Sequence, residues 1–208
     1  MQSSLFSGWN QIEAPDADIH YWPGWLTYPE QAEYYRKLQQ LQWQQSSLRI
    51  AGRQIPIPRL NAWYGDEGCK YGYSGVKLPL LPWTEELAEL RGRVVKECNH
   101  RFNSVLVNFY RTGEDSVDWH ADDEPELGRK PVIACVSLGA IRRFHLKPRR
   151  VGVAATLSLD LEPGSLLLMA GETQSHWLHR VAKTKKQVEG RISLTFRQVY
   201  TDDQKLFR

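Results

Sequence analysis

The 208-residue chain carries a net charge of +3, and 41% of its residues are apolar and 25% charged. This composition excludes an intrinsically disordered chain, and the length suits a single core. The longest apolar stretches have strand length, which excludes a membrane-spanning helix, and the N-terminus lacks the basic and apolar regions of a signal peptide. We therefore expect a cytoplasmic protein without a membrane partner, or a nuclear one if the source is eukaryotic.

Two helices are predicted in the first half of the chain. Residues 27–30 read Thr-Tyr-Pro-Glu, which is the form of a capping box with proline near the first helical position. We expect a helix to follow and to continue to about Trp43. A second helix is expected over about residues 84–100, where apolar residues recur at helical spacing. These residues are Leu87, Leu90, Val94 and Cys98.

Most of the remaining chain is predicted as short strands that are separated by turn residues. The strands are expected at residues 56–64, 104–110, 132–138, 142–146, 154–159, 165–169 and 191–199. Many short strands at such spacing indicate a β-sandwich or barrel. The fold class is therefore mainly β with flanking helices (α+β), with an N-terminal extension over residues 1–50 and one main domain over residues 51–208.

The densest chemical signal is the segment 118–124, Asp-Trp-His-Ala-Asp-Asp-Glu. Positions i and i+2 of a strand project from the same face, so His120 and Asp122 can reach one ion. Two imidazoles and one carboxylate form the facial triad of non-heme Fe(II) oxygenases, which leaves positions open for a bidentate cosubstrate and for dioxygen. Spacing alone leaves both His176 and His179 as candidates for the third ligand.

Residues 191–197 alternate without exception between polar and apolar side chains. A strand with this alternation has one polar face, which carries Arg191, Ser193, Thr195 and Arg197. Such a face usually contacts solvent, but two arginines can also bind the carboxylates of a dicarboxylate through bidentate bonds. Asn108 and Tyr110 share a face of an earlier strand and can donate to carboxylate oxygens, as a chelating keto acid with a distal carboxylate requires.

Basic residues gather in two segments that suit contact with phosphates. They are Arg142, Arg143, Lys147, Arg149 and Arg150 in the first segment and Lys183, Lys185 and Lys186 in the second. A solvated surface is the alternative interpretation of both segments.

Four blocks of sequence, in order, closely resemble the AlkB family of nucleic-acid dealkylating dioxygenases. They are residues 58–66 with 71–75, residues 108–111, residues 115–124, and residues 176–179 with 191–197. The resemblance runs from about residue 58 to residue 199 and implies a double-stranded β-helix, or jelly-roll, core. One departure from the family pattern is Ser193, where the family usually has asparagine.

The resemblance implies a role for each matching residue. His120, Asp122 and His179 would bind Fe(II), which favours His179 over His176. The cosubstrate 2-oxoglutarate would be held by Asn108, Tyr110, Arg191 and Arg197, with Ser193 and Thr195 on the same strand face. A nucleotide-recognition segment is expected at about residues 51–80. The candidate substrate contacts are Arg59, Trp63, Tyr71, Tyr73, Ser74, Asp123 and Glu124, with core packing as the favoured alternative for Trp63.

The implied activity is oxidative demethylation of bases such as 1-methyladenine and 3-methylcytosine in DNA or RNA. In this reaction 2-oxoglutarate and dioxygen yield succinate and carbon dioxide, and the methyl group leaves as formaldehyde. We expect a monomer whose partner is alkylated nucleic acid, in single-stranded form. Two alternatives remain: an oxygenase of the same chemistry that acts on a protein or on an RNA modification, and a non-catalytic jelly-roll module that binds nucleic acid.

Overall fold

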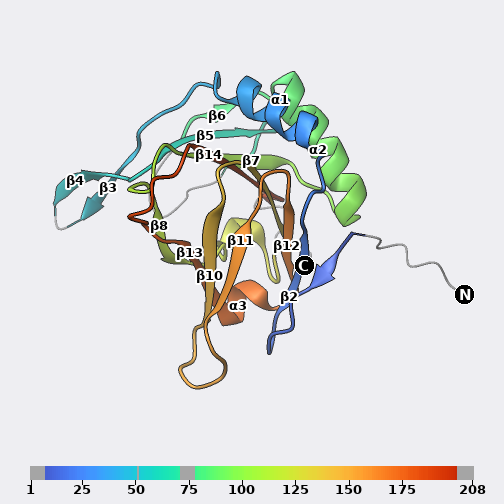
Figure 1. Ribbon diagram of the computed structural model, residues 1–208, viewed down its shortest axis with the longest axis vertical. Helices are drawn as coiled ribbons and strands as arrows, with labels where there is room; N and C mark the ends of the chain where they lie inside the picture. The colour runs from blue at the N-terminus through green and yellow to red at the C-terminus, as the bar shows by residue number, and fades with distance from the viewer. Residues whose placement is uncertain (1–7, 51, 71–77, 201–208) are drawn as a thin grey trace, which may run out of the picture.

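The computed structural model of the protein describes residues 8–50, 52–70 and 78–200. Two packed β-sheets form its centre, and two longer helices cover one of them (Figure 1). The helices of the described part are α1 (Tyr28–Leu38), α2 (Glu85–Cys98) and the short α3 (Thr173–His176), with a 3-10 turn, η1, at Pro125–Leu127. Among the described residues no helix has the length and apolar character that crossing a bilayer requires.

The major sheet has eight strands and the minor sheet has four. In spatial order the major sheet contains β1 (Asn10–Gln11), β2 (Asp18–Trp22), β12 (Leu166–Ala170), β9 (Ile133–Gly139), β14 (Arg191–Arg197), β7 (Ser104–Tyr110), β5 (Leu60–Gly65) and β6 (Leu80–Leu81). The minor sheet contains β11 (Leu157–Leu161), β10 (Arg142–Pro148), β13 (Trp177–Val181) and β8 (Val117–His120). A separate hairpin is formed by β3 (Ser47–Ile50) and β4 (Arg53–Pro56). Two facing, largely antiparallel sheets are the architecture of a jelly roll, as predicted.

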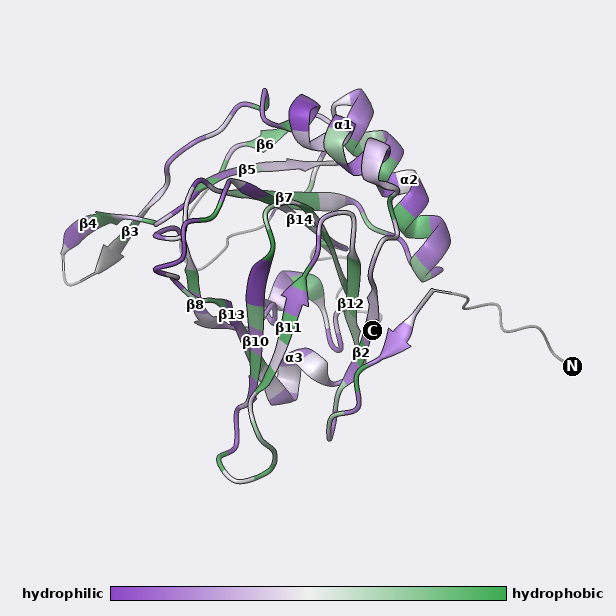
Figure 2. Ribbon diagram, in the orientation of Figure 1, coloured by the Kyte–Doolittle hydropathy of each residue, from purple (hydrophilic) through white to green (hydrophobic). Residues whose placement is uncertain are grey.

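Each face of the major sheet is covered by a different apolar layer. Between the two sheets, Phe144 of β10 and Met169 of β12 belong to one buried cluster. On the other face, Leu38 of α1, Leu90 of α2 and Phe196 of β14 belong to a second cluster beneath the helices. Figure 2 shows apolar and polar residues side by side along α2, as a helix with one buried and one exposed face requires.

Helix α1 begins where the sequence predicts and ends earlier. The carboxylate of Glu30 accepts the backbone N–H of Thr27 at 2.7 Å, and its other oxygen accepts a hydrogen bond from Arg93 of α2 at 3.0 Å. The predicted continuation to Trp43 is wrong, because the helix ends at Leu38. After it the chain makes tighter turns, and Trp43 packs against the apolar cluster beneath the helices. Tertiary packing overrides the local preference of the Gln-rich segment here.

Several strands differ from the predicted ranges. The expected strand at 56–64 is divided, because Pro56 ends β4 and β5 begins only at Leu60. Strands β1 and β2 were not predicted, although Ile19 and Tyr21 of β2 alternate with exposed or half-buried neighbours. Residues before 51, expected as an N-terminal extension, therefore supply two strands to the major sheet and a helix above it.

The helix-covered layer should carry much of the stability of the fold. We expect Phe196→Ala to lower the free energy of unfolding by about 3–5 kcal/mol, because a fully buried ring is lost and a cavity remains. Urea denaturation followed by circular dichroism measures the change. Val151→Ala is the control, since Val151 is 101% exposed and its loss should shift stability by less than about 0.5 kcal/mol. Equal stability of the two variants would contradict the prediction.

Candidate metal and cosubstrate site

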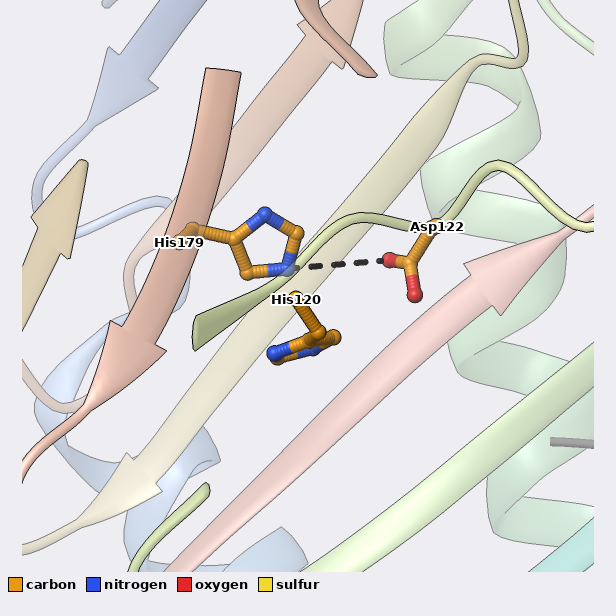
Figure 3. A group of neighbouring side chains, drawn as sticks. All are labelled: His120, Asp122 and His179. Atoms are coloured by element: carbon orange, nitrogen blue, oxygen red, sulfur yellow. Dashed lines mark ion pairs between the residues drawn. The ribbon is translucent and has the colours of Figure 1, made fainter. Parts of the chain in front are cut away.

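Three predicted ligand residues meet between the two sheets. His120 is the last residue of β8, and His179 lies directly opposite it on β13. Asp122 follows two residues after the end of β8, so the prediction that both residues of the His-x-Asp pair lie in the strand is wrong. The loop nevertheless turns the carboxylate of Asp122 toward the ring of His179 (Figure 3).

The geometry of these side chains fits a single metal ion. One ligand atom from each residue lies within 4.8 Å of the others, and His179 Nε2 is 4.0 Å from Asp122 Oδ2. Asp122 is 1% exposed and His179 is 5% exposed. His176 is the alternative that the spacing left open, and the structure places it on α3 with an exposed side chain. The ligand set is therefore His120, Asp122 and His179.

Both imidazoles are in the neutral form that binds a metal. Burial, and then the neighbouring His120, lower the pKa of His179 to about 3 although Asp122 opposes this shift. Burial also lowers the pKa of His120. Nδ1 of His120 is 2.8 Å from the carbonyl oxygen of Asp118, which can only accept, so the proton is on Nδ1 and Nε2 is left for the ion.

Two contacts hold Asp122 in place, namely an ion pair with Arg197 and a hydrogen bond with the side-chain amide of Gln174. Burial alone would raise the pKa of Asp122, but the guanidinium of Arg197 and the two histidines outweigh it and keep the pKa below its ordinary value. Nη2 of Arg197 donates to Asp122 Oδ1 at 2.6 Å. The backbone N–H of Asp122 donates to the side-chain oxygen of Gln174 at 3.0 Å. Gln174 lies in α3, far along the sequence, and no sequence pattern pointed to it.

All six predicted cosubstrate residues line one cavity together with the three ligands. They are Asn108, Tyr110, Arg191, Ser193, Thr195 and Arg197. The antiparallel register brings them together, because Arg191 pairs with Tyr110 and Ser193 pairs with Asn108. The polar face of β14 thus points toward the minor sheet, while its apolar face packs beneath the helices.

Arg191 provides the test of whether this cavity suits a dicarboxylate. Its side chain is 1% exposed, and Nη2 donates to the hydroxyl of Ser137 at 2.8 Å. Its Nε and Nη1 are buried and have no hydrogen-bond partner among the described residues. Burial lowers the pKa of Arg191, yet a guanidinium remains charged. A buried charge with two free donors fits a carboxylate ligand, because leaving it unpaired is costly.

The residues of the two basic segments have different surroundings in the structure. Arg142 is buried and donates to the backbone carbonyl groups of Thr112, Asp115 and Ala182, which is a structural role. Arg143 makes two hydrogen bonds with a carboxylate, that of Asp160. Arg149, Arg150, Lys183, Lys185 and Lys186 are exposed.

The predicted substrate residues have different surroundings. Arg59 is 5% exposed, lines the cavity and donates from Nε to Asn108 Oδ1 at 2.9 Å. Trp63 is buried in a small apolar cluster with Leu106, which agrees with the packing alternative. Asp123 pairs with Arg149, and Glu124 is half-buried beside the 3-10 turn. Tyr71, Tyr73 and Ser74 lie outside the described residues.

Comparison with known proteins agrees with this geometry. The profile of the 2OG-Fe(II) oxygenase superfamily matches residues 18–197. The mouse protein named DNA oxidative demethylase ALKBH2 is 38% identical over 162 residues, which cover 74% of this chain and 67% of that protein. The chain belongs to the AlkB family of 2OG-Fe(II) oxygenases. Membership implies dependence on Fe(II) and 2-oxoglutarate, for which the cavity holds matching residues.

Other AlkB relatives extend this result. The rat protein named alpha-ketoglutarate-dependent dioxygenase alkB homolog 3 is 46% identical over 155 residues, which cover 71% of this chain. The chain spans 52% of the length of that relative. A solved structure, described as that of OsALKBH1, covers 90% of this chain and 100% of its own, with a TM-score of 0.64 and 20% identity, and shows the same fold.

Gln174 should position Asp122 for the metal. We expect Gln174→Leu to weaken metal binding about tenfold, because the N–H of Asp122 loses its acceptor and the loop loses its orientation. Calorimetric titration with Mn(II), an air-stable substitute for Fe(II), measures the dissociation constant. Gln174→Glu keeps an acceptor and should bind Mn(II) more tightly than the leucine variant. Ser175→Ala, an exposed neighbour on α3, serves as control, and an unchanged constant in Gln174→Leu would reject this role.

Proposed function

We propose that the protein demethylates N-alkylated bases in single-stranded nucleic acid by oxidising the alkyl group, with 1-methyladenine and 3-methylcytosine as the substrates. The observation that carries this proposal is one cavity that contains the His-Asp-His ligand set, with Asp122 and His179 buried, and two donors of Arg191 that have no partner among the described residues. The relatives named as a DNA oxidative demethylase and as an alkB homolog support the choice of substrate class.

The residues of the chain have separable tasks in this reaction. Bound iron and 2-oxoglutarate supply, with dioxygen, the oxidising power that hydroxylates an N-methyl group, after which formaldehyde leaves the base. Arg191 and Arg197 present cationic donors to the cosubstrate side of the cavity, and Asn108 and Tyr110 face them from β7. The surrounding apolar side chains, such as Phe144 stacked on His179 with ring centroids 5.2 Å apart, keep water from the ligands.

A second cavity gives the substrate a route to the metal. Its volume is about 570 Å³, and it shares Arg59, Val117, His120 and Val181 with the cosubstrate cavity. A base in a duplex cannot reach a metal that lies inside a sandwich unless it leaves the stack. A base that cannot pair, or that lies in a single strand, leaves the stack at lower cost. This difference supports a preference for single-stranded substrates.

The direct test is formaldehyde release from a single-stranded oligonucleotide that contains one 1-methyladenine, with Fe(II), 2-oxoglutarate and oxygen present. Mass spectrometry of the oligonucleotide should show loss of the methyl group. We expect His120→Ala and Asp122→Ala to abolish turnover while circular dichroism stays unchanged, because the ligands lie in a preformed cavity. Wild-type activity in either variant would reject the ligand assignment.

The same assay separates the competing functions. One possible result is that the enzyme releases no formaldehyde from single-stranded DNA, duplex DNA or RNA and yet turns over a peptide or an RNA modification. That result would replace this proposal with another oxygenase activity. Binding of nucleic acid without any consumption of oxygen in the presence of Fe(II) and 2-oxoglutarate would indicate a non-catalytic module.

Arg191 should determine the requirement for 2-oxoglutarate. We expect Arg191→Ala to raise the 2-oxoglutarate concentration for half-maximal rate by roughly tenfold or more, since a hydrogen-bonded charge contributes about 1.5–3 kcal/mol. Arg191→Lys should lie between the alanine variant and the wild type. Arg143→Ala removes an exposed arginine that is paired with Asp160 and should leave the requirement unchanged. An Arg191→Ala enzyme with wild-type requirement would exclude this arginine as the carboxylate contact.

A further inference from the structure

Strand β8 contains an irregularity next to the metal ligands. His120 pairs with His179 and Val117 pairs with Val181, so Asp118 and Trp119 together lie opposite the single residue Arg180. This is the arrangement of a β-bulge, which redirects side chains next to a functional site. Because of it, Val117 and His120 both line the cosubstrate cavity although they are three positions apart.

The bulge brings Trp119 against two cations. The guanidinium carbon of Arg180 and the Nζ of Lys147 each lie 4.4 Å from the centroid of the Trp119 ring. A cation over an indole ring is stabilised by the electrons of the ring. The ring therefore holds these two cations close to the second cavity, which Trp119 also lines.

Neither cation over the Trp119 ring has a carboxylate partner among the described residues, and Arg180 is the one that also lines the second cavity. Its Nε is buried without a hydrogen-bond partner, and no ion pair of Arg180 is present among the described residues. Arg180 also contributes to the positive surroundings that, after burial, lower the pKa of His145 on the neighbouring strand. A half-buried guanidinium that lines a cavity without a carboxylate partner is suited to an anion that offers two oxygens for a bidentate contact, such as a phosphate.

Arg180 lines the second cavity, which has both apolar and cationic lining residues. Leu48, Ile57 and Pro58 contribute apolar side chains to this lining, and Arg59, Arg180 and Lys183 contribute cations. Lys183 is 3.5 Å from Glu114, and Arg59 donates to Asn108 Oδ1 and to the carbonyl oxygen of Ser116, whereas Arg180 has no ion pair in the part of the chain that the structure describes. Asp118 is the carboxylate in this lining, and its Oδ1 accepts the backbone N–H of Trp119.

A groove lined by both apolar and cationic side chains fits a single strand of nucleic acid, because the strand presents bases to the apolar groups and phosphates to the cations. We propose that Arg180, held over Trp119 by the β8 bulge, binds a backbone phosphate next to the damaged nucleotide. This assignment rests on the proposed function for the class of substrate. Arg180 adjoins His179 in the chain, so a phosphate fixed here sets the position of the strand relative to the metal.

Binding of a fluorescein-labelled single-stranded DNA that contains 1-methyladenine tests this assignment without turnover. Fluorescence anisotropy over a range of salt concentrations should show about tenfold weaker binding by Arg180→Ala. The slope of the logarithm of the binding constant against the logarithm of the salt concentration should become less steep by about 0.7, which corresponds to one lost phosphate contact on a single strand. Arg180→Lys should keep the salt dependence and bind with intermediate affinity. Trp119→Phe, which keeps an aromatic ring, should weaken binding less than Arg180→Ala.

The matched control is Arg143→Ala, which makes the same change in net charge at an arginine paired with Asp160 on the same sheet. It should bind within about twofold of the wild type. Equal affinity and salt dependence of Arg180→Ala and wild type would overturn the assignment, even if the wild type releases formaldehyde. Polyglutamate serves as a competitor of the labelled DNA. If it competes as well as unlabelled DNA, and does so only when Arg180 is present, the phosphate assignment is overturned in favour of an acidic peptide. A wild type that binds DNA through Arg180 but releases no formaldehyde would reject only the proposed function.

Discussion

The buried ion pair between Arg197 and Asp122 is the interaction on which the site depends. Both side chains are almost fully buried, and each would be unfavourable without the other. Arg197 keeps Asp122 ionised, as a metal ligand must be, although burial favours the neutral acid. The pair also joins β14, in the interior of the major sheet, to the loop after β8 of the minor sheet. Because Arg197 also lines the cavity of the proposed cosubstrate residues, this ion pair links the metal ligands to that cavity.

The two sheets divide the chemistry between them. The minor sheet supplies both histidines, on neighbouring strands, and the major sheet supplies the polar faces of β7 and β14. This division works because the helices cover the opposite face of the major sheet and take up its apolar side chains. A sandwich with helices on one side can therefore contain a polar patch between its sheets, provided that each charged group there has a partner or a ligand.

Strand β8 connects the metal site with the outer surface. Its bulge directs His120 into the sandwich and Trp119 toward Arg180 within a few residues. An edge strand can accept this irregularity, because it has a hydrogen-bonded neighbour on one side only. The proposed phosphate contact, Arg180, lies on β13 beside the ligand His179 and opposite the bulge that precedes the ligand His120, so a change in the bulge would affect both sites.

The sequence by itself determined which residues share a face. Strict alternation in residues 191–197 separates the arginines from Ile192 and its apolar neighbours, and the spacing of His120 and Asp122 marks a ligand pair. It could not determine that the polar face points inward, because alternation is the same for a buried and a solvated polar face. Only the tertiary structure decided this, by packing the helices on the apolar face. It also decided the buried structural role of Arg142 and the contact of Gln174 with Asp122, since both depend on segments distant in the chain.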